Sequence, residues 1–181
     1  TKNIGGNWTH TGMSVQGANR VLTVDPSNSN IMYLGTGDHG LLKSIDGGYS
    51  WKLISASSST GVLNGFKYGW DTTGVAVDPS NSNIVWAVDD VVLDSTYLGG
   101  VVKSTNGGAS WSFIKETGYA NDIILDPKSP VSSRVLLVGA LGNVYRSQDG
   151  GSNWSSSSLG GKVRQIVIDP TNSSYVYVVQ C

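Results

Sequence analysis

The chain has 181 residues, with 12 lysines and arginines against 13 aspartates and glutamates and a formal net charge of −1. This balance, with no basic stripe along any segment, lacks the electrostatic footprint of a nucleic-acid-binding protein. No apolar run approaches the roughly 20 residues of a membrane helix, and residues 1–12 lack the pattern of a signal peptide. We therefore expect a mature or excised soluble segment, with neither nucleic acid nor a membrane as a partner.

A single cysteine, Cys181, limits the chemistry of the chain. A single cysteine allows neither an internal disulfide framework nor a thiol metal site. We therefore predict no metal and no cofactor. Any disulfide partner of Cys181 would lie outside the chain. The composition includes 24 glycines, is rich in Ser, Asn and Thr, and disfavours helices. It suits many short strands joined by tight turns, which predicts an all-β fold.

The first well-formed unit in chain order defines a repeat. Residues 21–25 alternate apolar and polar side chains, and residues 31–34 form a second apolar run, so both are predicted strands. Pro26 ends the first strand and begins a turn, because proline donates no ladder hydrogen bond. The unit closes with Ser-Ile-Asp-Gly-Gly-Tyr-Ser-Trp at residues 44–51.

The same unit recurs along the chain. Asp-Pro pairs return at residues 78–79, 126–127 and 169–170, and the closing box returns at 104–111 and 147–154, with a worn copy at 1–8. This spacing is typical of four-stranded propeller blades of about 40 to 50 residues. We predict repeats at residues 1–12 (partial), 13–56, 74–116, 121–160 and 162–181 (partial).

The box residues are predicted to be structural. A short Asp or Asn side chain accepts hydrogen bonds from the backbone of its own turn, glycine permits positive φ, and tryptophan packs over the hairpin. The predicted structural residues are Ser44, Asp46, Gly48, Trp51, Ser104, Asn106, Gly108, Trp111, Ser147, Asp149, Gly151 and Trp154.

These boxes resemble the Asp box, or bacterial neuraminidase repeat, of sialidases, sortilin-like receptors, photosystem assembly factors and β-propeller glucanases. Residues 19–26, Asn-Arg-Val-Leu-Thr-Val-Asp-Pro, with residues 31–36 and 40–44, are most similar to the xyloglucan-active glucanases of glycoside hydrolase family 74. The resemblance implies β-propeller blades and an extracellular or cell-surface protein that acts on polysaccharide. That family's first catalytic aspartate lies in an Arg-Thr-Asp-x-Gly-Gly-type segment, which is absent here, so we transfer no catalytic residue.

The first and last repeats are incomplete, which would leave strand edges open. Open edges invite pairing, and propellers normally close on themselves. Two interpretations follow: the chain is part of a longer propeller whose remaining blades complete it, or further copies of the chain complete a ring or fibre.

Residues 55–73 form a long connection in which function would concentrate. Its candidate carbohydrate-binding residues are Phe66, Tyr68, Trp70 and Asp71, because aromatic faces stack on sugar rings and a carboxylate accepts hydroxyl hydrogen bonds. The alternative is that the rings cover the side of the propeller itself. Asp38 and His39, on a short loop between strands, are further candidates.

A second insertion, residues 89–97, gathers three carboxylates in what we expect to be a solvated polar loop. Paired carboxylates could instead serve glycoside hydrolysis or bind calcium, although the spacing of a calcium loop is missing. Three sequons place candidate glycosylation sites at Asn7, Asn153 and Asn172.

Three functions compete. The first is an extracellular propeller segment that binds polysaccharide or oligosaccharide, and the second is a non-enzymatic protein-interaction or self-assembly module, suggested by open strand edges and Cys181. A sialidase would need a cluster of arginines for the substrate carboxylate. The four arginines lie scattered among the predicted strands, at Arg20, Arg134, Arg146 and Arg164.

Overall fold

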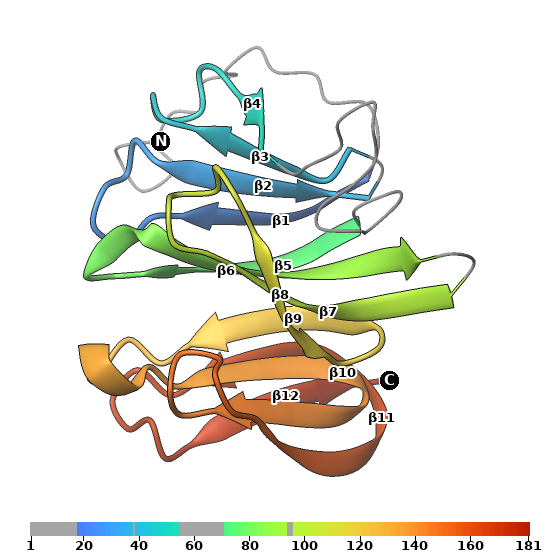
Figure 1. Ribbon diagram of the computed structural model, residues 1–181. Helices are drawn as coiled ribbons and strands as arrows, with labels where there is room; N and C mark the ends of the chain where they lie inside the picture. Colours follow the sequence, from blue (N-terminus) through green and yellow to red (C-terminus); the bar gives the residue numbers. More distant parts are fainter. Residues whose placement is uncertain (1–17, 38, 55–70, 94–95) are drawn as a thin grey trace, which may run out of the picture.

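The computed structural model describes residues 18–37, 39–54, 71–93 and 96–181, and these residues form twelve β-strands and one short 3-10 turn (Figure 1). The prediction of an all-β fold is confirmed. Within these ranges no helix is long and apolar enough to cross a membrane. The strands are β1 (Asn19–Val24), β2 (Met32–Thr36), β3 (Leu41–Ser44), β4 (Lys52–Leu53), β5 (Asp71–Asp78), β6 (Asn81–Leu93), β7 (Thr96–Ser104), β8 (Ser112–Glu116), β9 (Ala120–Leu125), β10 (Leu136–Ser147), β11 (Ser155–Ile168) and β12 (Val176–Gln180).

The strands form three four-stranded antiparallel sheets, which follow one another in the chain as propeller blades do. Their strand orders are β1-β2-β3-β4, β5-β6-β7-β8 and β9-β10-β11-β12. Figure 1 shows the sheets stacked in sequence order, with the Asp-Pro turns at the left and the ends of β2 and β6 and the starts of β3 and β7 at the right. We call the left side the turn end and the right side the loop end.

In the third sheet, β10 and β11 each change partner at a glycine. Residues 136–140 of β10 pair with β9, and residues 143–146 pair with residues 155–158 of β11. Residues 163–168 of β11 pair with β12, so residues 163–180 form a two-stranded fourth unit. The changes occur near Gly142 and Gly160, whose φ values of 79° and 78° favour glycine.

Three apolar cores lie between successive units rather than within them. The first joins Tyr33 and Leu41 of the first sheet to Val85 and Trp111 of the second. The next joins the second sheet to the third around Trp86, Leu136 and Val138, and the last joins the third sheet to the fourth unit around Leu137, Val163 and Ile166. Each unit is therefore stabilised by apolar burial against its neighbours.

Side chains also connect the first strand of one sheet to the first strand of the following sheet. The hydroxyl of Thr23 donates to the Val75 carbonyl at 3.0 Å, and that of Thr73 to the Ala120 carbonyl at 2.8 Å. Glycine permits the close approach of these strands. A Cβ at Gly74 would lie 2.9 Å from the backbone nitrogen of Ile123.

The expectation of a polar loop at residues 89–97 is wrong. Strands β6 and β7 extend through most of this segment and pair up to the Leu93–Thr96 position. Asp89 pairs with Gly100 in the ladder, is fully buried and accepts a 2.5 Å hydrogen bond from the Thr72 hydroxyl. An acid that its sequence neighbours made look solvated therefore lies in a buried contact with Thr72.

Candidate functional site

At the turn end, each Asp-Pro aspartate caps its own turn. The carboxylate of Asp25 accepts the backbone N–H of Ser27 at 2.8 Å, and Asp78, Asp126 and Asp169 accept the N–H two residues further on in the same way. Burial opposes ionisation of Asp25, but hydrogen bonds from Ser82, Ser27 and Asn28 outweigh it and lower its pKa. These aspartates act in turn formation.

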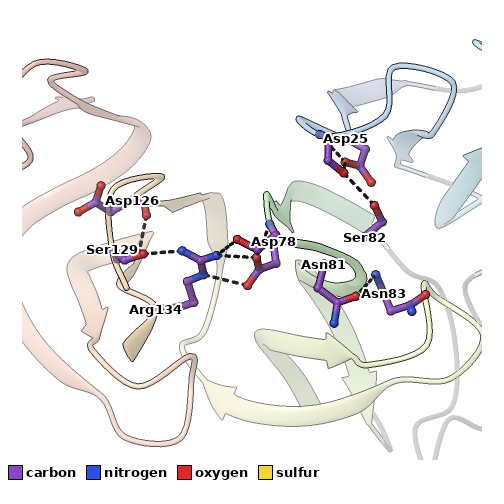
Figure 2. A network of polar contacts seen from close by, with 10 residues as sticks. Asp25, Asp78, Asn81, Ser82, Asn83, Asp126, Ser129 and Arg134 are labelled. Atoms are coloured by element: carbon purple, nitrogen blue, oxygen red, sulfur yellow. Dashed lines mark hydrogen bonds and ion pairs between the residues drawn. The ribbon is translucent and has the colours of Figure 1, made fainter. Parts of the chain in front are cut away.

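The same aspartates connect one unit to the next (Figure 2). The guanidinium of Arg134 holds both carboxylate oxygens of Asp78, at 2.9 and 2.7 Å, and its third nitrogen donates to the Ser129 carbonyl. Burial opposes ionisation of Asp78, but the hydrogen bonds from Arg134, Ser80 and Asn81 together with the Arg134 charge outweigh it, and the pKa of Asp78 is lowered. The Ser173 hydroxyl similarly donates to Asp126 at 2.8 Å. The turn end is thus largely occupied by structural contacts.

The boxes also close on themselves. The Ser44 hydroxyl donates to Asp46 at 2.8 Å and accepts the Gly48 N–H at 2.9 Å, while the Trp51 indole donates to the Gly48 carbonyl at 2.9 Å. The Ser, Asp or Asn, and glycine contacts recur in the boxes at 104–111 and 147–154. Hydrogen bonds, chiefly from Ser50, lower the pKa of Asp46 to about 2. This geometry supports the structural role that we predict for the boxes.

Two of the candidate glycosylation sites, Asn153 and Asn172, lie at turns of the described chain. The Asn153 side-chain amide donates to Asp149 at 2.7 Å, so its nitrogen is engaged within the box. Asn172 is exposed in the turn before β12. Asn7 lies outside the described residues.

At the loop end, Arg20 and Asp71 form an exposed ion pair between the first two sheets. Arg20 lies at the start of β1, and Asp71 is the first residue of β5. The guanidinium binds both carboxylate oxygens, with Nε–Oδ1 and Nη2–Oδ2 distances of 3.1 and 3.0 Å. The side chains remain 47% and 25% exposed, so both keep polar atoms available to a ligand.

The neighbouring β2–β3 loop carries another sequence candidate, His39. Its backbone N–H donates to the Thr36 hydroxyl at 3.0 Å, and its side chain is exposed. A Cβ on Gly37 of this loop would lie 3.3 Å from the Arg20 guanidinium, so the loop adjoins the ion pair. The other candidates, Asp38, Phe66, Tyr68 and Trp70, lie outside the described residues.

Tyr119 is a loop-end residue that we did not predict. It precedes β9, is 41% exposed, and has the Lys162 ammonium 6.0 Å from its ring centroid. Its position in the sequence could have indicated it. Tyr119 lies between β8 and β9, in the same connection between sheets that residues 55–70 occupy between β4 and β5. Among the described residues, no group of three His, Cys, Asp or Glu side chains could hold a metal ion.

Comparisons with known proteins agree with this architecture, although no protein-family model matches the chain. A xyloglucanase from Hypocrea jecorina (strain QM6a) is 34% identical over 127 residues, which cover 61% of this chain and 14% of that protein. A GH74 enzyme from Niastella koreensis superposes with a TM-score of 0.68 and 25% identity, over 90% of this chain and 26% of the enzyme.

Two further structures show the fold alone. An ancestral GH74 enzyme has a TM-score of 0.67 at 24% identity, covering 90% of this chain and 22% of the enzyme. YCF48 bound to D1 peptide has a TM-score of 0.59 at 20% identity, covering 85% of this chain and 45% of YCF48.

Proposed function

From the premise that this chain is a GH74-like β-propeller, we propose that its loop end binds polysaccharide outside the cell, with xyloglucan-type glucans as the ligand class. The exposed Arg20–Asp71 pair carries this proposal. The matching xyloglucanase region is only 14% of that protein, so we limit the proposal to binding.

The chemistry of the loop end suits sugar hydroxyls. A guanidinium offers several donors and a carboxylate offers acceptors, and their mutual ion pair holds both in a fixed orientation. The adjacent His39 side chain can donate or accept. Phe66, Tyr68 and Trp70 immediately precede Asp71 in the chain, and aromatic faces of this kind stack on sugar rings.

The third sheet also carries an exposed aromatic residue at the loop end. Tyr119 lies at the same end of the third sheet, and the residue is 41% exposed. A polymer chain would contact several units at once, and such multiple contacts add in affinity. This arrangement favours an extended polysaccharide over a monosaccharide.

Isothermal titration with xyloglucan oligosaccharides tests the proposal. We expect saturable binding by the unaltered chain and at least about tenfold weaker binding by Asp71→Asn and by Arg20→Ala, since tenfold corresponds to one lost hydrogen bond of roughly 1.4 kcal/mol.

Lys52→Ala is the matched control, because Lys52 is an exposed charge on β4 of the first sheet. It should bind like the unaltered chain. An absence of heat with the unaltered chain, or equal binding by all four proteins, would refute the proposed site.

A further inference from the structure

The box of the second sheet differs from the other two in one reactive group. Residues 46–47 and 149–150 are Asp-Gly, whereas residues 106–107 are Asn-Gly. The backbone nitrogen of a glycine can attack the side-chain amide of a preceding asparagine, because glycine has no side chain to obstruct the approach. Asparagine is accordingly among the thermolabile residues of proteins. The second box thus carries an amide that can be lost as ammonia, and the other two carry the acid that such a loss would leave.

Hydrogen bonds in the folded turn hold both groups that would react. The side-chain oxygen of Asn106 accepts the Ser104 hydroxyl at 2.9 Å and the Ser110 N–H at 2.8 Å. Its Nδ2 donates to the Ser110 hydroxyl at 2.8 Å. The backbone N–H of Gly107, which carries the attacking nitrogen, donates to the Asn83 carbonyl at 2.9 Å. Both groups must be released from these partners before they can react.

The first sheet keeps this turn closed. The Lys43 ammonium of β3 donates to the Gly107 carbonyl at 2.8 Å. A Cβ on Gly108 would lie 2.5 Å from Cδ1 of Ile54, so the first sheet packs directly against the turn. Both glycines are buried. The turn can therefore rearrange only when this part of the interface between the first and second sheets opens.

We propose that Asn106 is a spontaneous deamidation site whose rate is set by opening of the interface between the first and second sheets. The Gly107 nitrogen bonds to Cγ of Asn106, the Cγ–Nδ2 bond breaks, and the glycine amide proton leaves with Nδ2 as ammonia, which closes a succinimide ring. Water then opens the ring. Cleavage of the new bond at Cγ gives aspartate, and cleavage of the original peptide bond gives isoaspartate, whose main chain contains an extra methylene.

The aspartate product fits the box. In the first box, Asp46 accepts the Ser44 hydroxyl at 2.8 Å and the Ser50 N–H at 2.9 Å, which are the contacts that Asn106 makes in the second. The Ser50 hydroxyl donates to the other carboxylate oxygen at 2.5 Å, and the Ser110 hydroxyl needs only to rotate to do the same. The modified chain should keep the box geometry in its aspartate form and lose it in its isoaspartate form, because the extra methylene displaces the turn.

Peptide mapping by mass spectrometry measures the rate of deamidation at Asn106. The native chain and a capped peptide of residues 100–115 are incubated side by side in mildly alkaline buffer. We expect the native chain to react at least about tenfold more slowly than the peptide, which corresponds to an opening free energy of about 1.4 kcal/mol or more. Equal rates, or no reaction at Asn106 in the peptide, would overturn the proposal.

Lys43→Ala tests whether the first sheet controls this rate. It removes a hydrogen bond to the Gly107 carbonyl, so deamidation in the native chain should accelerate at least about threefold, as the loss of about 0.7 kcal/mol would give. Lys103→Ala is the matched control, because the Lys103 ammonium makes the same contact with the Gly150 carbonyl at the next interface, at 3.0 Å. It should leave the rate at Asn106 unchanged. Equal acceleration by both variants, or none by Lys43→Ala, would overturn the proposal.

A urea series decides the case in which Lys43→Ala fails to fold. Below the unfolding transition, the rate at Asn106 in the unaltered chain should rise with urea less steeply than the equilibrium constant of global unfolding. The reason is that opening one interface exposes less surface than unfolding the whole chain. A slope equal to that of global unfolding would overturn the proposal.

Asn106→Asp reproduces the aspartate product directly. We expect its thermal midpoint at neutral pH to lie within about 2 °C of that of the unaltered chain, because the box accepts either side chain. A fall of about 4 °C or more would overturn the proposed product. These measurements are independent of the polysaccharide proposal, since the box lies at the turn end and Arg20 and Asp71 lie at the loop end.

Discussion

At the scale of single residues, Arg134 shows how a charge can serve the fold. It looks like one of four scattered arginines in the sequence, yet its side chain is only 5% exposed and binds Asp78, 56 residues earlier in the chain. A buried ion pair stabilises only when its geometry is good and its remaining hydrogen bonds are satisfied. Here the Ser129 carbonyl and the Ser80 hydroxyl supply those additional contacts.

We expect Arg134→Met to lower the free energy of unfolding by about 3–5 kcal/mol, because it leaves the Asp78 carboxylate buried without its partner. Urea denaturation at neutral pH measures the change. Arg164→Met, an exposed arginine on β11, serves as the control and should cost much less. The double variant Asp78→Asn/Arg134→Met should recover part of the loss, and a single variant as stable as the unaltered chain would contradict the assigned role.

The lowered pKa values of the box aspartates predict that stability falls in acid. Hydrogen bonds hold the pKa values of Asp46 and Asp149 at about 2, below the usual 3.8. Because the folded pKa values are lowered, their stabilisation is present above pH 3.8 and is lost as the pH falls toward 2. The second box carries Asn106, whose amide makes the corresponding contacts without a charge.

We expect Asp46→Asn/Asp149→Asn to flatten the loss of stability between about pH 4 and 2. Denaturation midpoints measured from pH 2 to 7 test this expectation. Asp169→Asn is a useful comparison, since the pKa of Asp169 is also lowered, chiefly by the Thr171 hydroxyl. An acid response identical in the box double variant and the unaltered chain would count against the assignment.

At the scale of elements, local pattern predicted most strands and failed where pairing decides the structure. Alternation before each Asp-Pro pair predicted β1, β5, β9 and the second half of β11, because successive side chains of a strand point to opposite faces of the sheet. The segment at 89–97 was misread because its acids suggested solvent. Only the pairing of β6 with β7, and the buried contact of Asp89 with Thr72, explain why the strands continue.

The candidate site could be predicted only in part for a similar reason. Asp71 was singled out from its place in a long connection, but Arg20 was not recognised as its partner, since 51 residues separate them. The contact exists because β1 and β5 are the first strands of adjacent sheets and begin at the same end. Partners of this kind follow from the arrangement of units and leave no local pattern.

At the scale of the whole molecule, each unit contacts its described neighbours along the chain. The cores, the Asp-Pro bridges and the box contacts all join successive sheets. The second sheet is covered on both sides, whereas the fourth unit has two strands and exposed side chains such as Tyr177 and Val179. Stability in such an array is a sum of unit terms and nearest-neighbour terms.

Hydrogen exchange should therefore follow a gradient along the chain. We expect the amides of β5, β6 and β7 to exchange slowest and those of β12 fastest, because local opening begins where the fewest neighbours must be disrupted. Mass spectrometry of peptides from a native-state exchange series measures this order. Uniform protection across all three sheets would instead indicate a single cooperative unit.

The alternation of sheets and interfacial cores has a mechanical consequence. A force that pulls on the two chain ends would load the interfaces in series, so the weakest interface would yield first and leave the others intact. Extension under load should then proceed in steps. The fourth unit, which contains β12, should separate before the interface between the second and third sheets, where Arg134 binds Asp78. Under force, the units would therefore separate one after another, and the fold would not fail in a single cooperative step.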